Sequence, residues 1–456
     1  MSRAEIYDIV VAGAGPAGAT FAYFVSKLGL RVALLDMRGW DDLWGKPCGD
    51  AISHHTFTDI GLEPPRGDEV RQHVNVILIY SPNEKTVFRV DGKGYIIDRT
   101  KLGQRLVKGA ADNGVEVMLE TRILGPIVED GRVAGVKARS SRGELLKLRA
   151  RLVVEATGAS GAIKSRLPPE WAVAERLEPY DMNVAYRERR ELDYEIENPD
   201  YIRIYLNQSI APGGYWWFFP EGKSEVNAGL GVQAGKGYPS PRNIFYETLA
   251  TRPELKPTTR ILSAAGAPLP TRRPATTMVG PGIITIGDAG FTVNPVHGGG
   301  MSYSMKAARY AANAVEKAVE AGDWSVKALW SLNTEYMRNV GAKQAALDVF
   351  RIFLQQLSDD ELNYGMEKRL IREQDTYETS ASGQLRISAW DKLVRIILGL
   401  GRPTLLLKLK TVADYMKRVR RLYLEYPASP EDLPQWRARV AELYSSYFKD
   451  LGIEHP

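Results

Sequence analysis

The chain contains a single cysteine, Cys48, among its 456 residues, which excludes an internal disulfide and suits a reducing compartment. It has only five histidines, and no His, Cys and carboxylate side chains follow the spacing of a metal site, so we expect no bound metal. No apolar run reaches the length that crosses a membrane. No signal peptide precedes the first apolar run, which begins at Ile6. These absences favour a cytoplasmic protein.

The bulk composition is typical of a globular protein, with 44% hydrophobic and 25% charged residues. The length predicts two or three packed units. The formal charge of +5 is small for a chain of this size, and we expect no nucleic acid partner.

The most informative stretch lies near the N-terminus, where residues 13–18 read Gly-Ala-Gly-Pro-Ala-Gly. They follow a short apolar run, residues 6–11, which predicts a buried parallel strand. They open a helix of small residues that begins at Ala17, and a second apolar run, residues 31–35, ends at Asp36. Strand, glycine turn, helix, strand and terminal acid in this order predict a dinucleotide site.

Each position in this glycine turn has a physical role. Gly13 permits the tight bend, Gly15 lets backbone amides approach a pyrophosphate, and Gly18 lets helix and strand pack closely. The anion sits where the unpaired N–H groups of the first helical turn point, and Ala17 belongs to that turn. Asp36 is placed to accept hydrogen bonds from a ribose diol.

A second glycine-rich turn starts with Gly287-Asp288, after a buried apolar run. A carboxylate in such a turn can hold a sugar-like polyol, and the later run of three glycines that ends at Gly300-Met301 lets backbone N–H groups face a ring or a phosphate. A capped helix after a glycine turn would explain either half alone. One dinucleotide anchored at both ends explains the two turns together.

Between these turns the sequence pattern changes. Residues 74–90 predict a hairpin outside the first sheet, and residues 175–275 alternate apolar and polar side chains as an antiparallel sheet does. The predicted fold class is α/β, a Rossmann-like domain with an inserted antiparallel-sheet domain and a C-terminal helical region. The expected boundaries are 1–72, 96–174 and 276–330 for the discontinuous cofactor domain, 73–95 and 175–275 for the substrate domain, and 331–456 for the helical region.

Five aromatic residues stand in succession over residues 215–219 and are followed by Pro220. In a strand, Tyr215, Trp217 and Phe219 would lie on one face and the other two rings on the opposite face. Two interpretations stay open. The strand is packed on both sides, or its rings line a long apolar cavity for a ligand with few polar groups.

Four motifs together resemble the flavin-binding pattern of the p-hydroxybenzoate hydroxylase-like flavoproteins. They are Gly13-x-Gly15-x-x-Gly18, Asp98-Arg99, Ala156-Thr157-Gly158 and Gly287-Asp288. The resemblance covers about residues 1–330 and implies FAD, with Asp36 at the adenosine ribose, Arg99 by the phosphates and Asp288 at the ribityl-phosphate segment. No second GxGxxG unit for a nicotinamide cofactor occurs in the sequence.

The aromatic run also matches YxWxFP-(7 or 8 residues)-GxG, the motif of the geranylgeranyl reductases within that superfamily. Its specified places are filled by Tyr215, Trp217, Phe219, Pro220, Gly229 and Gly231. The element Pro47-Cys48-Gly49 resembles the cysteine turn that lies near the isoalloxazine in that branch. The resemblance implies an oxidoreductase that saturates isolated C=C bonds of geranylgeranyl lipids or geranylgeranyl diphosphate, as archaeal members do with ether-lipid precursors.

The expected site residues follow from these motifs. The cofactor set is Gly13, Gly15, Ala17, Gly18, Asp36, Cys48, Gly49, Arg99, Gly158, Asp288, Gly300 and Met301. The substrate set is Tyr215, Trp217, Phe219, Gly229 and Gly231, and the catalytic set is Cys48, Tyr215 and Trp217. Cys48 taken alone is a small buried filler; beside a flavin it could pack under the ring, polarise the alkene or relay a proton. The acid of the reaction stays unassigned between Cys48, the flavin and an ordered water.

Three questions stay open at this level. The main alternative function is an FAD-dependent monooxygenase acting on an aromatic or polyene substrate, and another is a non-catalytic FAD-binding protein at a membrane surface. Ferredoxin and NAD(P)H are both candidates for the electron donor. Residues 412–423 predict a basic amphipathic helix, which either contacts the inner face of the membrane peripherally or packs on the protein with a solvated face.

Overall fold

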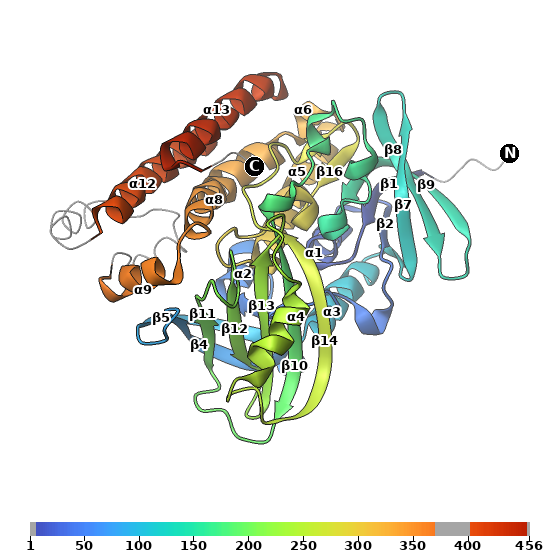
Figure 1. The fold of residues 1–456 in the computed structure, drawn as a ribbon. Helices are drawn as coiled ribbons and strands as arrows, with labels where there is room; N and C mark the ends of the chain where they lie inside the picture. The colour runs from blue at the N-terminus through green and yellow to red at the C-terminus, as the bar shows by residue number, and fades with distance from the viewer. Residues whose placement is uncertain (1–5, 370–401, 454–456) are drawn as a thin grey trace.

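The computed structural model describes residues 6–369 and 402–453. These residues form two eight-stranded sheets and a group of helices. The C-terminal helices lie on the side of the molecule away from the hairpin that extends the first sheet (Figure 1). The α/β fold class predicted from the sequence is confirmed.

The first sheet is built mainly from parallel strands, as the sequence predicts for the cofactor unit. Its strands are β1 (Ile6–Ala12), β2 (Val32–Leu35), β6 (Glu116–Met118), β7 (Thr121–Glu129), β8 (Arg132–Ser140), β9 (Leu145–Glu155), β15 (Val279–Gly280) and β16 (Ile283–Thr285). Their order is β15-β16-β9-β1-β2-β6, and the β7–β8 hairpin joins through β8 to β9. The central strand β1 pairs in parallel with both β2 and β9. The carboxyl ends of these three strands therefore meet at one edge of the sheet, where the predicted cofactor residues follow them.

The second sheet carries the aromatic run. Its strands are β3 (Ala51–Ser53), β4 (Val70–Tyr80), β5 (Val87–Ile97), β10 (Met182–Leu192), β11 (Tyr201–Tyr205), β12 (Tyr215–Pro220), β13 (Glu225–Gln233) and β14 (Thr258–Pro270). Their order is β14-β10-β13-β12-β11-β4-β5-β3. The expected hairpin is the β4–β5 pair. Two features differ from the expectation of an antiparallel sheet built from 73–95 and 175–275: β11 pairs with β4 in parallel, and β3 joins the sheet from within residues 1–72.

The described helices are mostly short until the C-terminal region. They are α1 (Pro16–Val25), α2 (His55–Ile60), α3 (Arg99–Ala111), α4 (Pro241–Glu247), α5 (Met301–Ala321), α6 (Val326–Leu329), α7 (Ser331–Tyr336), α8 (Ala342–Leu354), α9 (Asp359–Glu367), α12 (Pro403–Leu424) and α13 (Leu433–Leu451). Pro403 starts α12, a position where its missing N–H costs no helical hydrogen bond.

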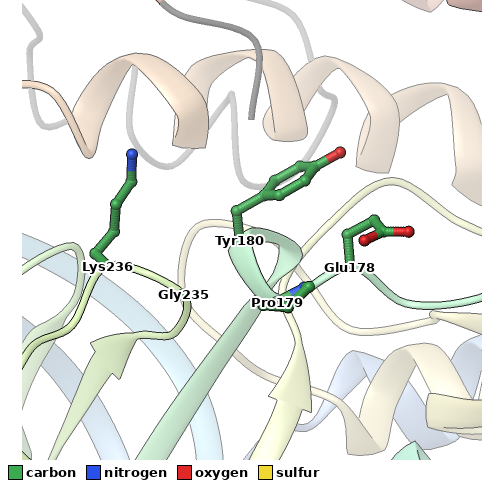
Figure 2. A pocket seen from close by; sticks show the side chains of 5 residues that line it. All are labelled: Glu178, Pro179, Tyr180, Gly235 and Lys236. Carbon is green, nitrogen blue, oxygen red and sulfur yellow. The ribbon is translucent and has the colours of Figure 1, made fainter.

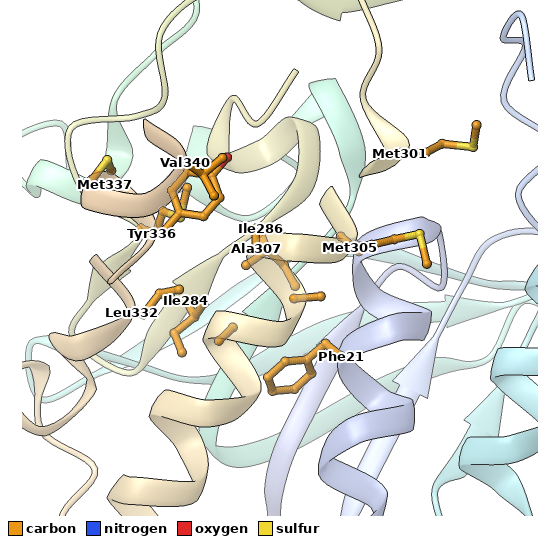
Figure 3. Packing of buried hydrophobic residues seen from close by; sticks show 14 of the residues in the cluster. Phe21, Ile284, Ile286, Met301, Met305, Ala307, Leu332, Tyr336, Met337 and Val340 are labelled. Carbon is orange, nitrogen blue, oxygen red and sulfur yellow. The ribbon is translucent and has the colours of Figure 1, made fainter. Parts of the chain in front are cut away.

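The main hydrophobic core joins the cofactor unit to the C-terminal helices. Phe21 of α1 packs with Met305 of α5 and with Ile284 of β16, and all three are fully buried (Figure 3). The same cluster continues through Tyr336 of α7 to buried residues of α8, α12 and α13. Burying a ring such as that of Phe21 stabilises the fold by about 3–5 kcal/mol relative to alanine. The C-terminal helices therefore share one core with the first sheet.

A buried ionic cluster ties the second sheet to α8. Arg351 of α8 lies 3.1 Å from Asp181, which directly precedes β10, and 2.6 Å from Asp348 on its own helix. Asp348 also pairs with Arg273 at 3.2 Å, just after β14. The side chains of Arg351 and Asp348 are at most 4% exposed, so each charge depends on its partners for solvation.

Candidate active site

The first glycine turn is tightly packed at two positions and open at the third. Gly13 has φ +103°, and an added Cβ there would lie 2.4 Å from the carbonyl oxygen of Ala156. A Cβ at Gly18 would lie 1.8 Å from the carbonyl oxygen of Gly13. A Cβ at Gly15 would meet nothing within 4 Å. Gly13 and Gly18 thus allow close packing, and Gly15 faces the open space beside the N-terminus of α1.

Asp36 follows β2 and is held in place by backbone amides. The amide of Ala14 donates to Oδ2 at 2.6 Å, and the amide of Arg38 donates to Oδ1 at 2.8 Å. Burial raises the pKa of Asp36, and the two amide hydrogen bonds oppose that shift. Each carboxylate oxygen keeps a further lone pair, so the group can still accept hydrogen bonds from a diol.

The two glycine-rich turns lie side by side. A Cβ at Gly287 would lie 2.9 Å from the Cβ of Ala17 on α1. The next residue, Asp288, accepts a 2.5 Å charged hydrogen bond from Lys46. Gly300 caps α5 without a side-chain hydrogen bond, which leaves amides of the first helical turn unpaired by any cap. The side chain of Met301 is buried in the main core, so only its backbone is available to a ligand.

Arg99 and Gly158 lie beside the same edge of the first sheet. Asp98 accepts a hydrogen bond from the amide of Lys101 at 3.0 Å, which caps α3 and fixes Arg99 as its first residue. The Nε of Arg99 is buried and has no hydrogen-bond partner among the described residues. Gly158 has φ +75° and open surroundings. A buried cationic donor without a partner is a feature that an anionic ligand would satisfy.

The aromatic strand β12 presents its rings to two different cores, as the alternation predicts. Trp216 stacks on Tyr205 with ring centroids 3.6 Å apart, and Phe218 lies in the same cluster on one face of the second sheet. Trp217 and Phe219 belong to another cluster on the opposite face, with Tyr215 packed against it. Both faces are therefore packed; four of the five rings are buried, and Tyr215 is partly exposed.

The two glycines of the GxG element pair with this strand in register. Gly229 lies opposite Trp217, and Gly231 lies opposite Tyr215. A Cβ at Gly229 would lie 2.5 Å from Cζ2 of Trp217, whereas a Cβ at Gly231 would meet nothing within 4 Å. Gly229 thus makes room for the indole, and Gly231 leaves open space beside Tyr215.

The cysteine turn joins the aromatic strand to the cofactor unit. Asn227 of β13 donates from Nδ2 to the carbonyl oxygen of Cys48 at 2.9 Å. A Cβ at Gly49 would lie 2.8 Å from Cε2 of Phe219. Lys46 of the same turn binds Asp288. The structure therefore brings the predicted cysteine turn, aromatic strand and second glycine turn together.

Tyr215 makes a second link between the two units. Its hydroxyl donates to the carbonyl oxygen of His297, in the loop before Gly298, at 2.6 Å. Burial, with a smaller contribution from the nearby Cys48, raises the pKa of Tyr215, so this hydroxyl keeps its proton at neutral pH.

Three polar residues of this site were not anticipated from the sequence: Lys46, Asp50 and Asn227. Asp50 is 5% exposed and lies 3.7 Å from Nη1 of Arg99. Burial raises the pKa of Asp50 to about 6, and Arg99 opposes that shift. Asn227 accepts from the indole N–H of Trp217 at 3.0 Å. The only sequence signals were their places: Lys46 and Asp50 lie two residues before and after Cys48, and Asn227 lies two residues before the GxG.

Two cavities of the described chain lie outside the aromatic strand. One of about 470 Å³ is lined by Glu178, Pro179, Tyr180, Gly235 and Lys236 (Figure 2). Another of about 550 Å³ lies next to Asp36 and includes Met37, Arg38 and Arg122. Neither is lined by the aromatic strand or by the cysteine turn, so the apolar cavity expected along β12 stays a prediction.

The basic amphipathic helix is α12, and its apolar face is covered by the protein. Val412, Met416, Val419 and Tyr423 are all at most 3% exposed and belong to the main core. The basic face is exposed; Arg421, for example, pairs there with a glutamate of the same helix end. Helix α12 therefore has the second arrangement considered from the sequence, in which the helix packs on the protein and its basic face is solvated. No helix within 6–369 or 402–453 is long and apolar enough to span a bilayer, and no metal-binding cluster of His, Cys and carboxylate side chains occurs there.

Known protein families match both the unit of the first sheet and the unit of the second sheet. Residues 8–164 match the FAD dependent oxidoreductase family, and residues 181–268 match the geranylgeranyl reductase catalytic domain, which includes the whole aromatic motif. The digeranylgeranylglycerophospholipid reductase of Sulfolobus acidocaldarius is 46% identical over 447 residues, which covers 98% of this chain and 99% of that protein. The chain belongs to the digeranylgeranylglycerophospholipid reductase family. Another member, digeranylgeranylglycerophospholipid reductase 2 of Methanopyrus kandleri, is 30% identical over 78% of this chain and 89% of its own.

Solved structures agree with this assignment. A geranylgeranyl bacteriochlorophyll reductase-like protein from Thermoplasma acidophilum has a TM-score of 0.75 and 25% identity, and covers 90% of this chain and 99% of its own. A myxobacterial chondrochloren halogenase, described as a new variant of FAD-dependent halogenases, has a TM-score of 0.62 at 20% identity. The match covers 92% of this chain and 97% of that one, and it shows the fold alone. The cofactor of this family member is FAD, as predicted from the glycine turns.

Proposed function

We propose that the protein saturates isolated C=C bonds in the geranylgeranyl chains of ether-lipid precursors, with FAD as its cofactor. The observation that carries the proposal is the position of the aromatic strand. Trp217 and Phe219 pack against the cysteine turn, and Lys46 of that turn binds Asp288 of the second glycine turn. The apolar rings thus lie next to the residues expected to hold the flavin.

The residues present fit FAD. We assign the pyrophosphate to the N-terminus of α1 beside Gly15, with Arg99 close to it, since Gly15 borders open space and Arg99 has an unsatisfied donor. Asp36 would hold the adenosine ribose. Asp288 would hold the ribityl-phosphate segment, with Gly158 and Gly300 beside it. The assignment of Met301 is restricted to its backbone amide.

An isolated alkene has no carbonyl group to stabilise added negative charge, so hydride addition alone is unfavourable. When bound and reduced, FAD supplies the hydride for one carbon. The protein must then supply a proton to the other carbon and stabilise the cationic character that develops on the carbon that accepts the hydride. The faces of Tyr215 and Trp217 can contribute about 1–2 kcal/mol each to that stabilisation in a desolvated site. The burial of Trp217 also keeps water away from the developing cation.

The decisive experiment is product analysis. The dithionite-reduced, FAD-saturated protein is incubated without oxygen with geranylgeranyl diphosphate and with a digeranylgeranylglycerol phospholipid, and the products are examined by mass spectrometry. We expect a gain of hydrogen pairs in at least one substrate. A flavin that is not reoxidised by either substrate contradicts the proposal. Uptake of oxygen with a hydroxylated product would support the monooxygenase instead.

Two finer points belong to the same proposal. Reduced ferredoxin and NAD(P)H are the donors to compare, by measuring the rate at which each reduces the bound flavin. We assign peripheral contact with the membrane to the exposed basic face of α12, whose apolar face is buried. Sedimentation with anionic vesicles, compared with neutral ones, tests that contact.

A further inference from the structure

Asp50 is a buried carboxyl group for which the mechanism above has no use. It directly follows the Cys48-Gly49 turn, and its φ of +59° is rare for a residue with a side chain. It is 5% exposed, and its Oδ1 has no hydrogen-bond partner within the described part of the chain. Its Oδ2 accepts one long hydrogen bond, 3.3 Å from Nδ2 of Asn227. A buried carboxyl that is so weakly bonded needs a reason to be there.

Asn227 connects this carboxyl to the aromatic face. The same Nδ2 that reaches Asp50 donates to the carbonyl oxygen of Cys48 at 2.9 Å. Its Oδ1 accepts the indole N–H of Trp217 at 3.0 Å. One amide therefore separates the carboxyl of Asp50 from the indole assigned to the substrate wall, on the side of the cysteine turn.

The charges that face Asp50 come from three elements. Arg99 approaches from α3 at 3.7 Å, Arg187 and Arg189 approach from β10, and Glu221 approaches from the end of β12. Arg189 forms an ion pair with Glu221, and Arg187 donates to a serine of β14. The arginines are thus only partly available to stabilise an Asp50 carboxylate.

Burial therefore decides the protonation of Asp50. Desolvation is the largest influence and Glu221 adds to it, whereas the three arginines oppose it. The resulting pKa of about 6 suits a general acid, because a group whose pKa lies near the working pH can both give up a proton and regain one.

We propose that Asp50 is the acid that gives the alkene its proton. This inference rests on the proposed function. As hydride from the reduced flavin forms one new C–H bond, the O–H bond of Asp50 breaks and its proton forms the second C–H bond on the neighbouring carbon. The product gains two hydrogens, the flavin is oxidised, and the Asp50 carboxylate regains a proton from solvent before the next turnover. Asn227 is a positioning residue, which holds the cysteine turn and the indole around this carboxyl.

The test uses the FAD-saturated full chain in single turnovers after dithionite reduction, with geranylgeranyl diphosphate as the alkene. In the parent we expect the rate to fall as pH rises above about 6, since the acid form is lost there. Asp50→Asn should lower the rate by about 10²–10⁴-fold and abolish that pH dependence. Asp50→Glu should keep a measurable rate and a pH-dependent limb. Asp91→Asn, at a strand position where the side chain is 75% exposed, is the matched control and should leave the rate unchanged.

A second measurement does not depend on activity. Infrared difference spectra of the FAD-bound protein between pH 5 and pH 8 should show a protonated carboxyl band that is absent in Asp50→Asn and present in Asp91→Asn. Two results would overturn the inference: a rate in Asp50→Asn within twofold of the parent, or the same pH-dependent limb surviving in it. Both leave alkene reduction by the parent intact, so the proposed function would stand. A parent that reduces no alkene would instead refute the proposed function and this inference with it.

Discussion

Replacing Asp50 with asparagine should make the fold more stable at neutral pH, although it removes a group that we assign to the reaction. The pKa of Asp50 in the folded chain is about 6, above the ordinary value of 3.8. Between pH 3.8 and about pH 6 the Asp50 carboxyl holds a proton in the folded chain that it releases in the unfolded chain. The free energy of unfolding therefore falls as pH rises through this range. At about 1.4 kcal/mol per pH unit, the ionised carboxyl costs the parent about 3 kcal/mol above pH 6. Asparagine stays neutral and avoids that cost.

The measurement is the free energy of unfolding in urea, for parent and variant, at pH 3.5 and at pH 7 in saturating FAD. The difference between variant and parent should shift in favour of the variant by about 3 kcal/mol over this range. The exposed Asp91→Asn control should shift by no more than a few tenths of a kcal/mol. A difference that is the same at both pH values would refute the assignment of a raised pKa to Asp50.

Three further outcomes follow from packing. Gly15→Ala should fold normally, because its Cβ meets no protein atom, but should bind FAD at least tenfold more weakly. Gly18→Ala should not yield folded protein, because its Cβ would lie 1.8 Å from a carbonyl oxygen. Flavin absorbance measures the first effect and circular dichroism the second. Gly229→Ala should lower the melting temperature, because the added Cβ would lie only 2.5 Å from the indole of Trp217 and force it to move. Gly231→Ala should leave the melting temperature unchanged, because its Cβ meets nothing within 4 Å. Scanning calorimetry of both variants checks this difference. Arg351→Met should cost about 1.5–3 kcal/mol in urea unfolding, because it removes the arginine that two buried aspartates share while Arg272 and Arg273 stay beside them; an unchanged midpoint would show that Arg351 does not stabilise the ionic cluster.

Local patterns predicted much of this fold because the physics behind them is local. The order of strand, glycine turn, helix and acid around Gly13–Gly18 follows from steric and amide requirements within a few residues. The two faces of β12 follow from the two-residue repeat of a strand. The cofactor residues that these patterns indicate are brought together at one edge of the first sheet.

Other features depend on partners that are distant in the sequence. The parallel pairing of β11 with β4 joins segments about 125 residues apart, and nothing in either strand specifies its neighbour. The apolar stripe of α12 is the same in a membrane-surface helix and in a packed one, and the partner that covers it comes from elsewhere in the chain. Asp50 and Asn227 look like ordinary loop and strand residues until the burial of their side chains is known.

The motif YxWxFP…GxG can now be divided by what each position touches. Trp217 fills the space above Gly229 and is fixed by Asn227, so this end of the strand is closed by the cysteine turn. At the other end Tyr215 is half-buried, and Gly231 opposite it borders open space. The two glycines therefore report on different properties: a Cβ at Gly229 perturbs the packing of the site, whereas a Cβ at Gly231 occupies space that a chain could use. An apolar substrate that approaches the rings from the Tyr215 end would reach Trp217, and the amide of Asn227 links that indole to the carboxyl of Asp50.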